Sequence, residues 1–465
     1  MKRAQPKLNF ISPSFNPLVL RLVHWSLPIL QKVRLQPWLP AGISKISTVN
    51  GLTLLKLYHQ FQLGKIRLIL AFRHCEVDDP LSGLHLLSRE IPQLARQQGI
   101  RLRSPVHSHF MYDRGMTIWA GKWLGWVFAK IGGVPVHRGR ALDLQAIKLL
   151  RELLVKGKFP LVVAPEGATN GHSEVVSPLE PGVAQLAFWN VEDLAKANRV
   201  EEVIVLPINI QYHYPNPQWS KLDRLLNQLE ADCGLPQSVT KDVRSESPTE
   251  VFYSRLLRLG EYLLSELEQF YRGFYHCQLP NLTQDLATTE DALTLRLQQL
   301  LDVSLQVGES YFGLKSTGNI IERCRRLEEA GWNYIYRHDQ QDLQNLSPVQ
   351  KGLADWIAAE ADLRLLHMRL AESFVAVQAD YIRQKPSFER FAETTLILFD
   401  AIARIKGTKN PRRPRLGWRT STVTIGEPIN VSDRAITYRQ NRSCAKQAVA
   451  QLTQDLQTAL VKMII

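Results

Sequence analysis

His74 and Asp79 lie five positions apart, and their types and spacing suit a proton-transfer pair. Asp79 comes directly before Pro80, a residue typical of the first turn of a helix, so its carboxylate is expected at a helix start. A carboxylate there can accept a hydrogen bond from the imidazole, which fixes the tautomer and leaves the other ring nitrogen facing a substrate. Such an imidazole can take the proton of an alcohol whose oxygen attacks a carbonyl carbon. A chain with 12 histidines also produces this spacing by chance, so the interpretation depends on the surrounding residues.

Other chemically capable residues follow strand-like segments of the same region. Arg138 follows the segment Gly-Gly-Val-Pro-Val-His, and its planar, permanently charged side chain suits a phosphate group. Glu166 and Gly167 lie where an apolar segment gives way to a loop. We expect Glu166 to hydrogen-bond an acceptor or to hold Arg138, and Gly167 to let the backbone approach a substrate.

Five short motifs, in this order, resemble the glycerolipid acyltransferase family that makes phosphatidic acid from lysophosphatidic acid. They are His-Cys-Glu-Val-Asp-Asp at 74–79, Gly-Gly-Val-Pro-Val-His-Arg at 132–138, Pro-Glu-Gly at 165–167, Val-Leu-Pro-Ile at 205–208 and Val-Thr-Ile-Gly-Glu-Pro-Ile at 423–429. The resemblance implies that His74 and Asp79 are catalytic. It implies that the substrate-binding residues are Arg138, Glu166, Gly167 and Pro207, of which Pro207 shapes the acyl site. It also implies that a helical stretch, residues 218–405, is inserted between two strands of one domain.

Three features depart from the pattern of that family. The third motif commonly continues Thr-Arg-Ser after Glu-Gly, whereas this chain has Ala-Thr-Asn at 168–170, so a second phosphate-binding arginine is missing. Arg73 stands where the family often has asparagine. Asp78 lies beside Asp79, so the partner carboxylate of His74 is assigned by spacing alone. The missing arginine leaves the identity of the acceptor open.

These residues and the resemblance predict an O-acyltransferase in glycerophospholipid synthesis. It would move a fatty acyl group from acyl-CoA or acyl carrier protein to the free hydroxyl of lysophosphatidic acid, giving phosphatidic acid. The thioester carrier is a substrate, and neither a cofactor nor a metal is expected, because the histidines and cysteines have no metal-ligand spacing. Glycerol 3-phosphate, another lysolipid or a simple alcohol stay open as acceptors. A catalytically idle lipid-surface or scaffold protein is the alternative from another functional class.

The elements that would position these residues alternate between strand and helix from residue 65 to residue 210. Strands are expected at 65–73, 134–137, 159–164 and 203–210, and helices at 80–99, 117–131, 141–156 and from Pro181 onward. Continuous apolar strands separated by helices predict an α/β fold, with a mostly parallel central sheet and helices on both faces.

The pattern changes after residue 215, where amphipathic helical runs replace strands. Helices are expected at 250–271, 291–307, 350–383 and 387–406, followed by a basic linker at 407–419, a strand at 421–425 and a helix at 443–464. We therefore predict a basic N-terminal segment, a discontinuous acyltransferase domain and a helical insertion with its linker. Their bounds are 1–50, then 51–217 with 418–465, then 218–417.

The N-terminal part of the chain is strongly basic. Eleven lysines and arginines precede the first acidic residue, Glu76, in a chain of net charge +13. Such a block suits an anionic membrane surface or an acidic donor protein. Nucleic acid is not expected as a partner, because no nucleic-acid-binding signature accompanies the basic residues.

Two segments carry apolar and aromatic residues that suit a lipid surface. Residues 17–30 are too interrupted by charged and proline residues to span a bilayer, but a helix is expected to begin at Asn16-Pro17. Trp25 lies in this helix, and interfacial binding is slightly favoured over packing on the protein's own core. Trp119, Trp123 and Trp126 share one helical face, for which a core-facing and a lipid-facing position are equally favoured.

The cysteines and the N-terminus bear on the compartment. The 5 cysteines are odd in number and form no Cys-x-x-Cys pair, which favours a reducing compartment. The basic start is followed by no clean apolar run of a secretory signal. We expect a cytoplasmic protein that associates peripherally with a membrane.

Overall fold

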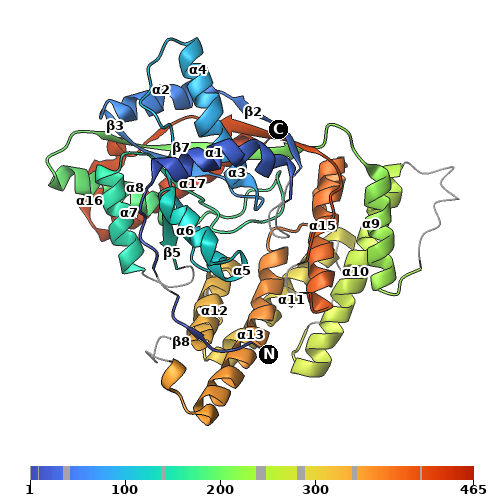
Figure 1. The fold of residues 1–465 in the computed structure, drawn as a ribbon. Helices are drawn as coiled ribbons and strands as arrows, with labels where there is room; N and C mark the ends of the chain where they lie inside the picture. The colour runs from blue at the N-terminus through green and yellow to red at the C-terminus, as the bar shows by residue number, and fades with distance from the viewer. Residues whose placement is uncertain are drawn as a thin grey trace. The chain divides into compact units, whose positions relative to one another are not determined.

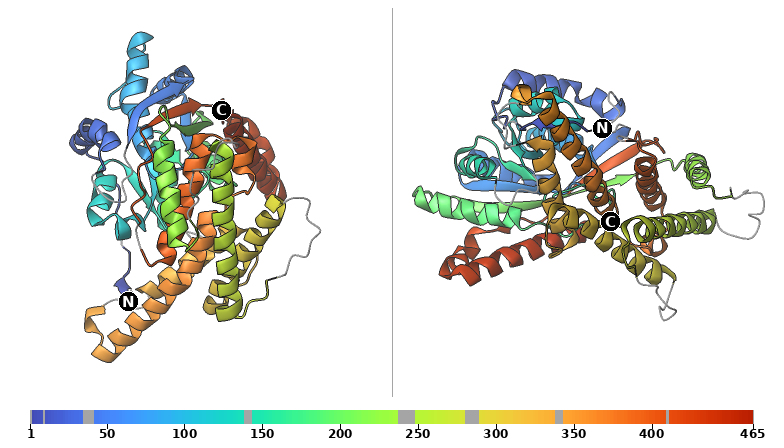
Figure 2. Two further views of the ribbon diagram at one scale, coloured as in Figure 1. Left: turned by 90° about the vertical axis from the view of Figure 1, so that its right-hand side faces the viewer. Right: turned by 90° about the horizontal axis from the view of Figure 1, so that it is seen from below.

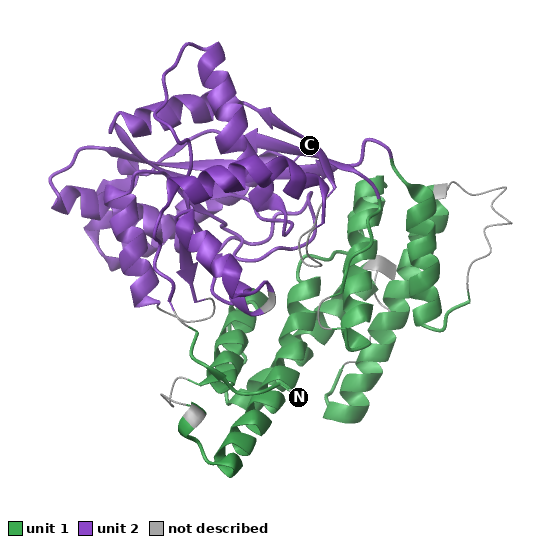
Figure 3. Ribbon diagram, viewed as in Figure 1, with its two compact units in different colours: residues 1–9, 138–141, 217–416 green, residues 10–137, 142–216, 417–465 purple. Residues whose placement is uncertain are grey.

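The computed structural model describes residues 2–8, 10–34, 42–137, 143–236, 248–279, 289–337, 343–408 and 411–464. The chain forms two compact units (Figure 3). Unit 1 comprises residues 1–9, 138–141 and 217–416, and unit 2 comprises residues 10–137, 142–216 and 417–465. Unit 2 is therefore assembled from segments that are far apart in the sequence.

Unit 2 is built around one twisted sheet (Figure 1). In the described ranges its strands lie in the order β2-β9-β7-β3-β6-β4-β5, and β10 also pairs with β7. The strands are β2 (Ile43–Val49), β3 (Ile66–Phe72), β4 (His109–Asp113), β5 (Gly133–Val136), β6 (Leu161–Val163), β7 (Glu202–His213), β9 (Arg419–Ile425) and β10 (Ile429–Asn430). Neighbouring strands run parallel except where β9 and β10 lie antiparallel to β7. The predicted, mostly parallel sheet is confirmed.

The central strands are apolar on both faces because both faces are covered. In β3, Leu68 and Leu70 belong to one hydrophobic core, whereas Ile69 and Ala71 belong to a second core on the opposite face. The first core includes side chains of α2 (Gly51–Gln62) and α4 (Ile91–Gln97). The second core includes side chains of α7 (Leu144–Lys156), α8 (Gly182–Lys196) and α17 (Arg442–Lys462). The predicted coverage of both faces by helices is confirmed.

Three predicted helices are interrupted. The one expected at 350–383 ends at Phe374, and a separate helix follows at Tyr381–Gln384. In place of a helix at 80–99 the chain forms α3 (Asp79–His85), a π-helical turn (Leu86–Glu90) and α4, which has a proline in its first turn. In place of a helix at 117–131 it forms α5 (Met116–Trp119) and α6 (Lys122–Lys130). Gly121 separates them with a φ of 97°, a conformation that glycine adopts without a steric penalty.

The remaining elements of unit 2 lie near its N- and C-terminal segments. Helix α1 (Pro17–Lys32) begins as predicted at Asn16, whose side chain accepts hydrogen bonds from the Leu18 and Val19 N–H groups. Helix α16 (Ala435–Gln440) precedes α17 and follows a short 3-10 turn (Ser432–Arg434). In the described ranges, no helix combines the length and the apolar composition needed to cross a bilayer.

Unit 1 is helical, as the sequence predicts. Its long helices α11, α12 and α13 pack beside one another (Figure 2). The helices are α9 (Trp219–Asp232), α10 (Pro248–Tyr275), α11 (Thr289–Phe312), α12 (Ile320–Ile335), α13 (Pro348–Phe374), α14 (Tyr381–Gln384) and α15 (Phe388–Ile405), with a 3-10 turn at Leu343–Asn345. A two-residue strand β1 (Gln5–Pro6) pairs with β8 (Tyr336–Arg337). Buried arginines fix the helices to one another: the Arg323 side chain donates to both carboxylate oxygens of Glu309 at 2.8 Å.

Candidate active site

The end of β3 places the first candidate residue. The Arg73 N–H donates to the Ile208 carbonyl at 2.9 Å, so strand pairing with β7 continues one residue beyond Phe72. The chain then turns, and α3 begins five residues after His74 with Asp79 as its first residue. The imidazole and the carboxylate therefore come from the two sides of one tight connection between a strand and a helix, at the carboxyl end of a parallel strand.

The side chains of His74 and Asp79 are in contact. His74 Nδ1 lies 3.1 Å from Asp79 Oδ2. The His74 side chain is 30% exposed, whereas that of Asp79 is fully buried. Nδ1 is thus engaged by the carboxylate, and Nε2 is the ring nitrogen that can meet a substrate at the exposed side. This arrangement suits an imidazole that acts as a proton acceptor.

Asp79 is held from several directions. The Tyr212 hydroxyl donates to Asp79 Oδ1 at 2.6 Å, and the Glu76 N–H donates to Oδ2 at 2.8 Å. Burial raises the pKa of Tyr212 well above its ordinary value, so this hydroxyl keeps its proton and acts as a donor. Because both oxygens have fixed donors, the carboxylate cannot rotate without breaking a buried hydrogen bond. The orientation of the His74 ring is fixed in turn.

Asp78, the neighbouring carboxylate, has a different partner. Arg419 of β9 forms an ion pair with Asp78 Oδ2. The same guanidinium lies over the Tyr212 ring, 4.5 Å from its centroid. The structure therefore separates the two adjacent aspartates: Asp79 contacts the imidazole, and Asp78 anchors the returning strand β9.

Glu166 lies directly behind His74. Its Oε2 accepts the His74 backbone N–H at 3.2 Å, and its Oε1 accepts the Ser177 N–H at 2.8 Å. Burial raises the pKa of Glu166, while the Arg73 guanidinium 3.7 Å away acts in the opposite direction. Among the described residues, Arg73 is thus the cation that pairs with Glu166. The predicted partner Arg138 lies outside the described residues.

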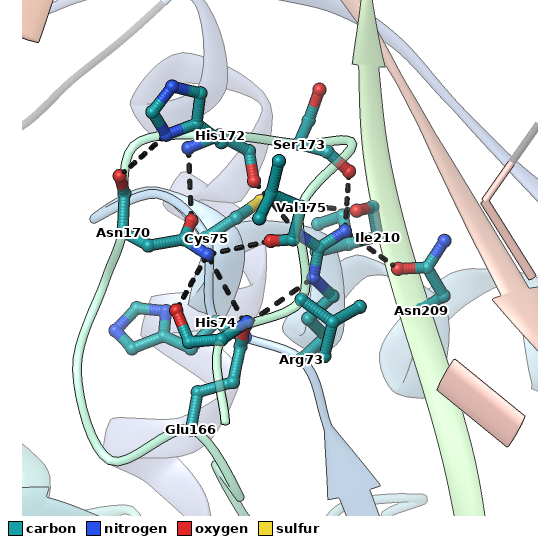
Figure 4. A network of polar contacts seen from close by, with 12 residues as sticks. Arg73, His74, Cys75, Glu166, Asn170, His172, Ser173, Val175, Asn209 and Ile210 are labelled. Atoms are coloured by element: carbon teal, nitrogen blue, oxygen red, sulfur yellow. Dashed lines mark hydrogen bonds and ion pairs between the residues drawn. The ribbon is translucent and has the colours of Figure 1, made fainter. Parts of the chain in front are cut away.

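Arg73 binds the loop that follows Glu166, as Figure 4 shows. The fully buried guanidinium donates to the carbonyl groups of His172, Ser173 and Val175, the His172 bond being 2.8 Å long. It also donates to Asn209 Oδ1 at 3.2 Å. Its terminal N–H groups are taken up by backbone carbonyls and an amide, and its Nε lies 3.7 Å from Glu166 Oε1, so Arg73 is not available to a substrate phosphate. Its position in the sequence, next to His74, gave no sign of this structural role.

Gly167 and Pro207 lie in tightly packed backbone. Gly167 has a φ of +70°, and a Cβ at this position would clash with the Glu180 carboxylate. Pro207 lies within β7, opposite Ala71 of β3, and its carbonyl accepts the Gly426 N–H at 2.9 Å. These contacts give both residues a structural reason for their types. The predicted roles in substrate binding and in shaping the acyl site stay predictions.

Cys75 is the one thiol beside His74 and Asp79 among the described residues. It is fully buried, and burial raises its pKa well above the ordinary value, so it stays a neutral thiol rather than a nucleophilic thiolate. Across the described ranges, no group of three or more histidine, cysteine or acidic side chains is arranged to hold a metal ion. The arrangement thus favours base-assisted attack by a substrate oxygen over a thiol-based covalent intermediate.

Sequence reasoning missed Tyr212 as a member of the site. A signal was present, because β7 changes from apolar residues to Asn-Ile-Gln-Tyr-His at 209–213. Since β7 is parallel to β3 and pairs with Phe72 through Ile208, these polar residues extend past the end of β3, where His74 lies. Polar residues at the carboxyl end of a buried parallel strand are typical of a site.

Comparison with known proteins gives a family match for part of unit 2. A protein-family model described as Acyltransferase matches residues 101–211. The matched segment includes Glu166, Gly167 and Pro207, and it begins after His74 and Asp79. A search of curated proteins found no match. Residues 101–211 therefore match an acyltransferase-family domain, and this match supports a general acyltransferase activity.

Proposed function

We propose that the protein transfers a fatty acyl group from a thioester carrier to the free hydroxyl of lysophosphatidic acid, giving phosphatidic acid. The observation that carries the proposal is the contact between the half-buried His74 imidazole and the fully buried Asp79 carboxylate, 3.1 Å apart at a strand end. The acyltransferase-family match over residues 101–211 supports the reaction class. The five motifs that resemble phosphatidic-acid-forming enzymes support the acceptor.

In the proposed reaction His74 is the general base. Its Nε2 takes the proton of the acceptor hydroxyl as the hydroxyl oxygen attacks the thioester carbonyl carbon, forming the new carbon–oxygen bond. The carbon–sulfur bond then breaks, and the departing thiolate takes the proton back from the imidazolium, which leaves the ester, the free thiol and a neutral His74. Asp79 holds the ring and stabilises its transient positive charge.

Glu166 is proposed to act as a support for this geometry. Its carboxylate joins the His74 backbone N–H to the Ser177 N–H and so ties the base to the 170–177 loop. Arg138 and Pro207 are proposed to contact the acceptor phosphate and the acyl chain, respectively. Acyl-CoA and acyl carrier protein are both proposed donors, since each presents the same thioester to His74.

Another acceptor is favoured by one observation. The segment Ala-Thr-Asn at 168–170 lacks the arginine common in the family, and Arg73 has its guanidinium occupied by the loop. Glycerol 3-phosphate, a different lysolipid or an uncharged alcohol therefore belong in the same assay.

The test is acyl transfer by the purified full-length protein. Acyl-CoA and acyl carrier protein donors are offered with lysophosphatidic acid, other lysophospholipids, glycerol 3-phosphate and simple alcohols. We expect product with lysophosphatidic acid, and loss of turnover in His74→Ala at an unchanged melting temperature. His85→Ala is the matched control, because His85 lies at the far end of α3 and pairs with Glu90 at 3.4 Å.

Three outcomes would contradict parts of the proposal. Full activity in His74→Ala would remove the assigned base. Preference for an uncharged alcohol would reject lysophosphatidic acid as the acceptor. Absence of turnover with every donor and acceptor, together with vesicle binding, would favour the idle lipid-surface or scaffold protein.

A further inference from the structure

Helix α1 exposes one continuous apolar stripe. Its members have exposed fractions of 63% at Leu18, 65% at Leu22, 74% at Trp25 and 49% at Ile29. At 100° per residue these positions fall within an arc of about 60° on one side of the helix. The opposite side packs on the protein through the buried residues Leu20, Leu27 and Gln31. The stripe is therefore separate from the face that holds α1 in unit 2.

Helix α6 adds exposed aromatic area beside α1. The two helices are in contact, and the Ser14 and Asn16 N–H groups donate to carbonyls of Ala129 and Lys130 at the end of α6. Trp123 and Trp126 of α6 are each 53% exposed. Tryptophan pairs an apolar ring with a polar N–H and concentrates at the boundary between lipid tails and headgroups. We call the four α1 residues with these two tryptophans the apolar face.

The charge around the apolar face is positive. Arg21 and Lys32 are exposed on α1 at the edge of the stripe, and Lys122 is exposed at the start of α6. No acidic residue occurs in either helix, and none precedes Glu76 in the chain. Basic side chains bordering exposed apolar ones match an anionic bilayer, whose phosphates lie above its acyl chains.

The apolar face is connected to the candidate active site. On its packed side α1 contacts α3, and Gln31 Nε2 lies 3.3 Å from His85 Nδ1 at the end of α3. Asp79, which contacts His74, is the first residue of the same helix α3. One seven-residue helix thus joins the helix with the apolar stripe to the carboxylate of the site.

We infer that the apolar face docks the protein on the surface of an anionic phospholipid bilayer, with the α1 stripe and the two α6 tryptophans entering the headgroup region. The basic residues Arg21, Lys32 and Lys122 then meet lipid phosphates. The inference rests on the proposed function, because the acceptor proposed there is a lipid that lies in a membrane. Docking holds the lipid surface against the outer side of α1, whose packed side contacts α3.

The test is co-sedimentation of the full-length protein with vesicles. One set contains phosphatidylcholine alone, and the other contains equal amounts of phosphatidylcholine and phosphatidylglycerol. We expect binding to the mixed vesicles that weakens with added salt. The double variant Leu22→Glu/Trp25→Glu is expected to bind at least about tenfold more weakly, because it removes two inserted apolar side chains. Arg21→Gln/Lys32→Gln is expected to lose binding to the mixed vesicles and to change little on neutral ones.

The matched control is Val200→Glu/Ile436→Glu. Both residues are exposed apolar side chains of unit 2, at 96% and 78%, and lie outside the apolar face. This variant introduces the same two charges, so unchanged vesicle binding supports the inference. Equal loss in both variants would overturn it, because added negative charge alone would then explain the effect. Melting temperatures are measured for every variant. A large drop in the melting temperature of Leu22→Glu/Trp25→Glu would show that the stripe is packed rather than exposed, which would overturn the inference.

Activity separates this inference from the proposed function. With a short-chain donor and acceptor that are dissolved as monomers, Leu22→Glu/Trp25→Glu is expected to turn over like the wild type, and with acceptor embedded in vesicles it is expected to be slower. Wild-type turnover without vesicle binding would overturn the inference and leave the proposed function intact. His74→Ala is expected to bind vesicles like the wild type but to show no turnover. A stripe that instead mediates association of two copies would appear as a dimer that the variant converts to monomers, which would overturn membrane docking.

Discussion

The Tyr212 hydroxyl donates a hydrogen bond of 2.6 Å to Asp79 Oδ1, the carboxylate oxygen that does not contact His74. Through Tyr212, strand β7 therefore holds Asp79, and Asp79 in turn holds the His74 imidazole. A tyrosine in this position acts through another side chain, so its loss should affect turnover without removing the base.

Tyr212→Phe is expected to lower kcat about tenfold and to leave KM nearly unchanged. The hydrogen bond to a buried carboxylate contributes about 1.5 to 3 kcal/mol, part of which appears as a less well oriented imidazole. Steady-state kinetics measure the effect. Tyr112→Phe is the control, since Tyr112 is also buried but its hydroxyl has no hydrogen-bond partner among the described residues. Equal losses in the two variants would show that Tyr212 has no special connection to Asp79.

Asp79→Asn and Asp78→Asn should separate the roles of two adjacent carboxylates. Asp79→Asn is expected to lower kcat by about a hundredfold or more, because the amide no longer holds the imidazole in the required tautomer. Asp78→Asn weakens the ion pair with Arg419, so it should mainly lower the free energy of unfolding. Kinetics and urea unfolding of both variants make the comparison. A larger kinetic loss in Asp78→Asn would reverse the assignment.

Arg73→Met should release the loop at residues 170–177. The substitution leaves Glu166 buried without its cation and frees three backbone carbonyls, so we expect a loss of about 3 to 5 kcal/mol in the free energy of unfolding. Turnover per folded molecule is expected to fall as well. Arg67→Met is the control, because Arg67 lies on the same strand and also donates to backbone carbonyls, those of Leu153, Leu154 and Gly157. It should destabilise the protein but spare turnover per folded molecule.

Gly167→Ala should be more destabilising than the equivalent change at Gly64. Both glycines have a positive φ, +70° and +72°, so each alanine adds about 1 kcal/mol of backbone strain. A Cβ at Gly64 meets no atom within 4 Å, whereas a Cβ at Gly167 clashes with the Glu180 carboxylate. Urea unfolding gives the two free-energy changes. Adding Glu180→Ala should bring Gly167→Ala close to the Gly64 value, and failure to do so would locate the cost elsewhere.

Acid should destabilise unit 2 through His107. Burial lowers the pKa of His107 from 6.5 to about 4, so between these values the unfolded chain binds a proton that the folded chain does not. Stability conferred by the neutral ring is complete above pH 6.5 and falls as the pH drops toward 4, by up to about 3 kcal/mol across the window. Unfolding in urea at a series of pH values should show a shallower slope for His107→Gln. A remaining slope is expected from His367 of unit 1, whose pKa burial also lowers to about 4.

The fold was predictable where burial on both faces left a continuous apolar run. Residues 65–73 and 203–210 were expected to be strands, and they form most of β3 and β7. β2 was not predicted, because Ile-Ser-Lys-Ile-Ser-Thr-Val alternates weakly and its polar side chains face solvent or pair with β9. β4 was not predicted either, because His, Tyr and Asp interrupt the apolar pattern of this five-residue strand. Helix α12 was missed although Asn319 and Glu322 form a capping box at its start.

The candidate site was predictable as far as local spacing reaches. The contact between His74 and Asp79 crosses five residues, and a strand that leads into a helix largely determines it. Contacts between distant segments could not be predicted from spacing. Tyr212 lies 133 residues from Asp79, and Arg419 lies 341 residues from Asp78. Sequence spacing also could not show that Arg73 faces inward and uses its charge on the 170–177 loop.

The return of the chain as β9 has a consequence for synthesis on the ribosome. In the described part of the chain β9 is the neighbour of β2 in the sheet, and it also completes the edge of β7. Residues 217–416 of unit 1 must be translated before β9 emerges, which takes roughly 10 to 40 seconds at about 5 to 20 residues per second. During that interval a nascent chain carries β2 without its partner and β7 with one open edge. Both strands then offer unpaired backbone groups to other nascent chains, so the sheet is most prone to mispairing while the helical unit is being made.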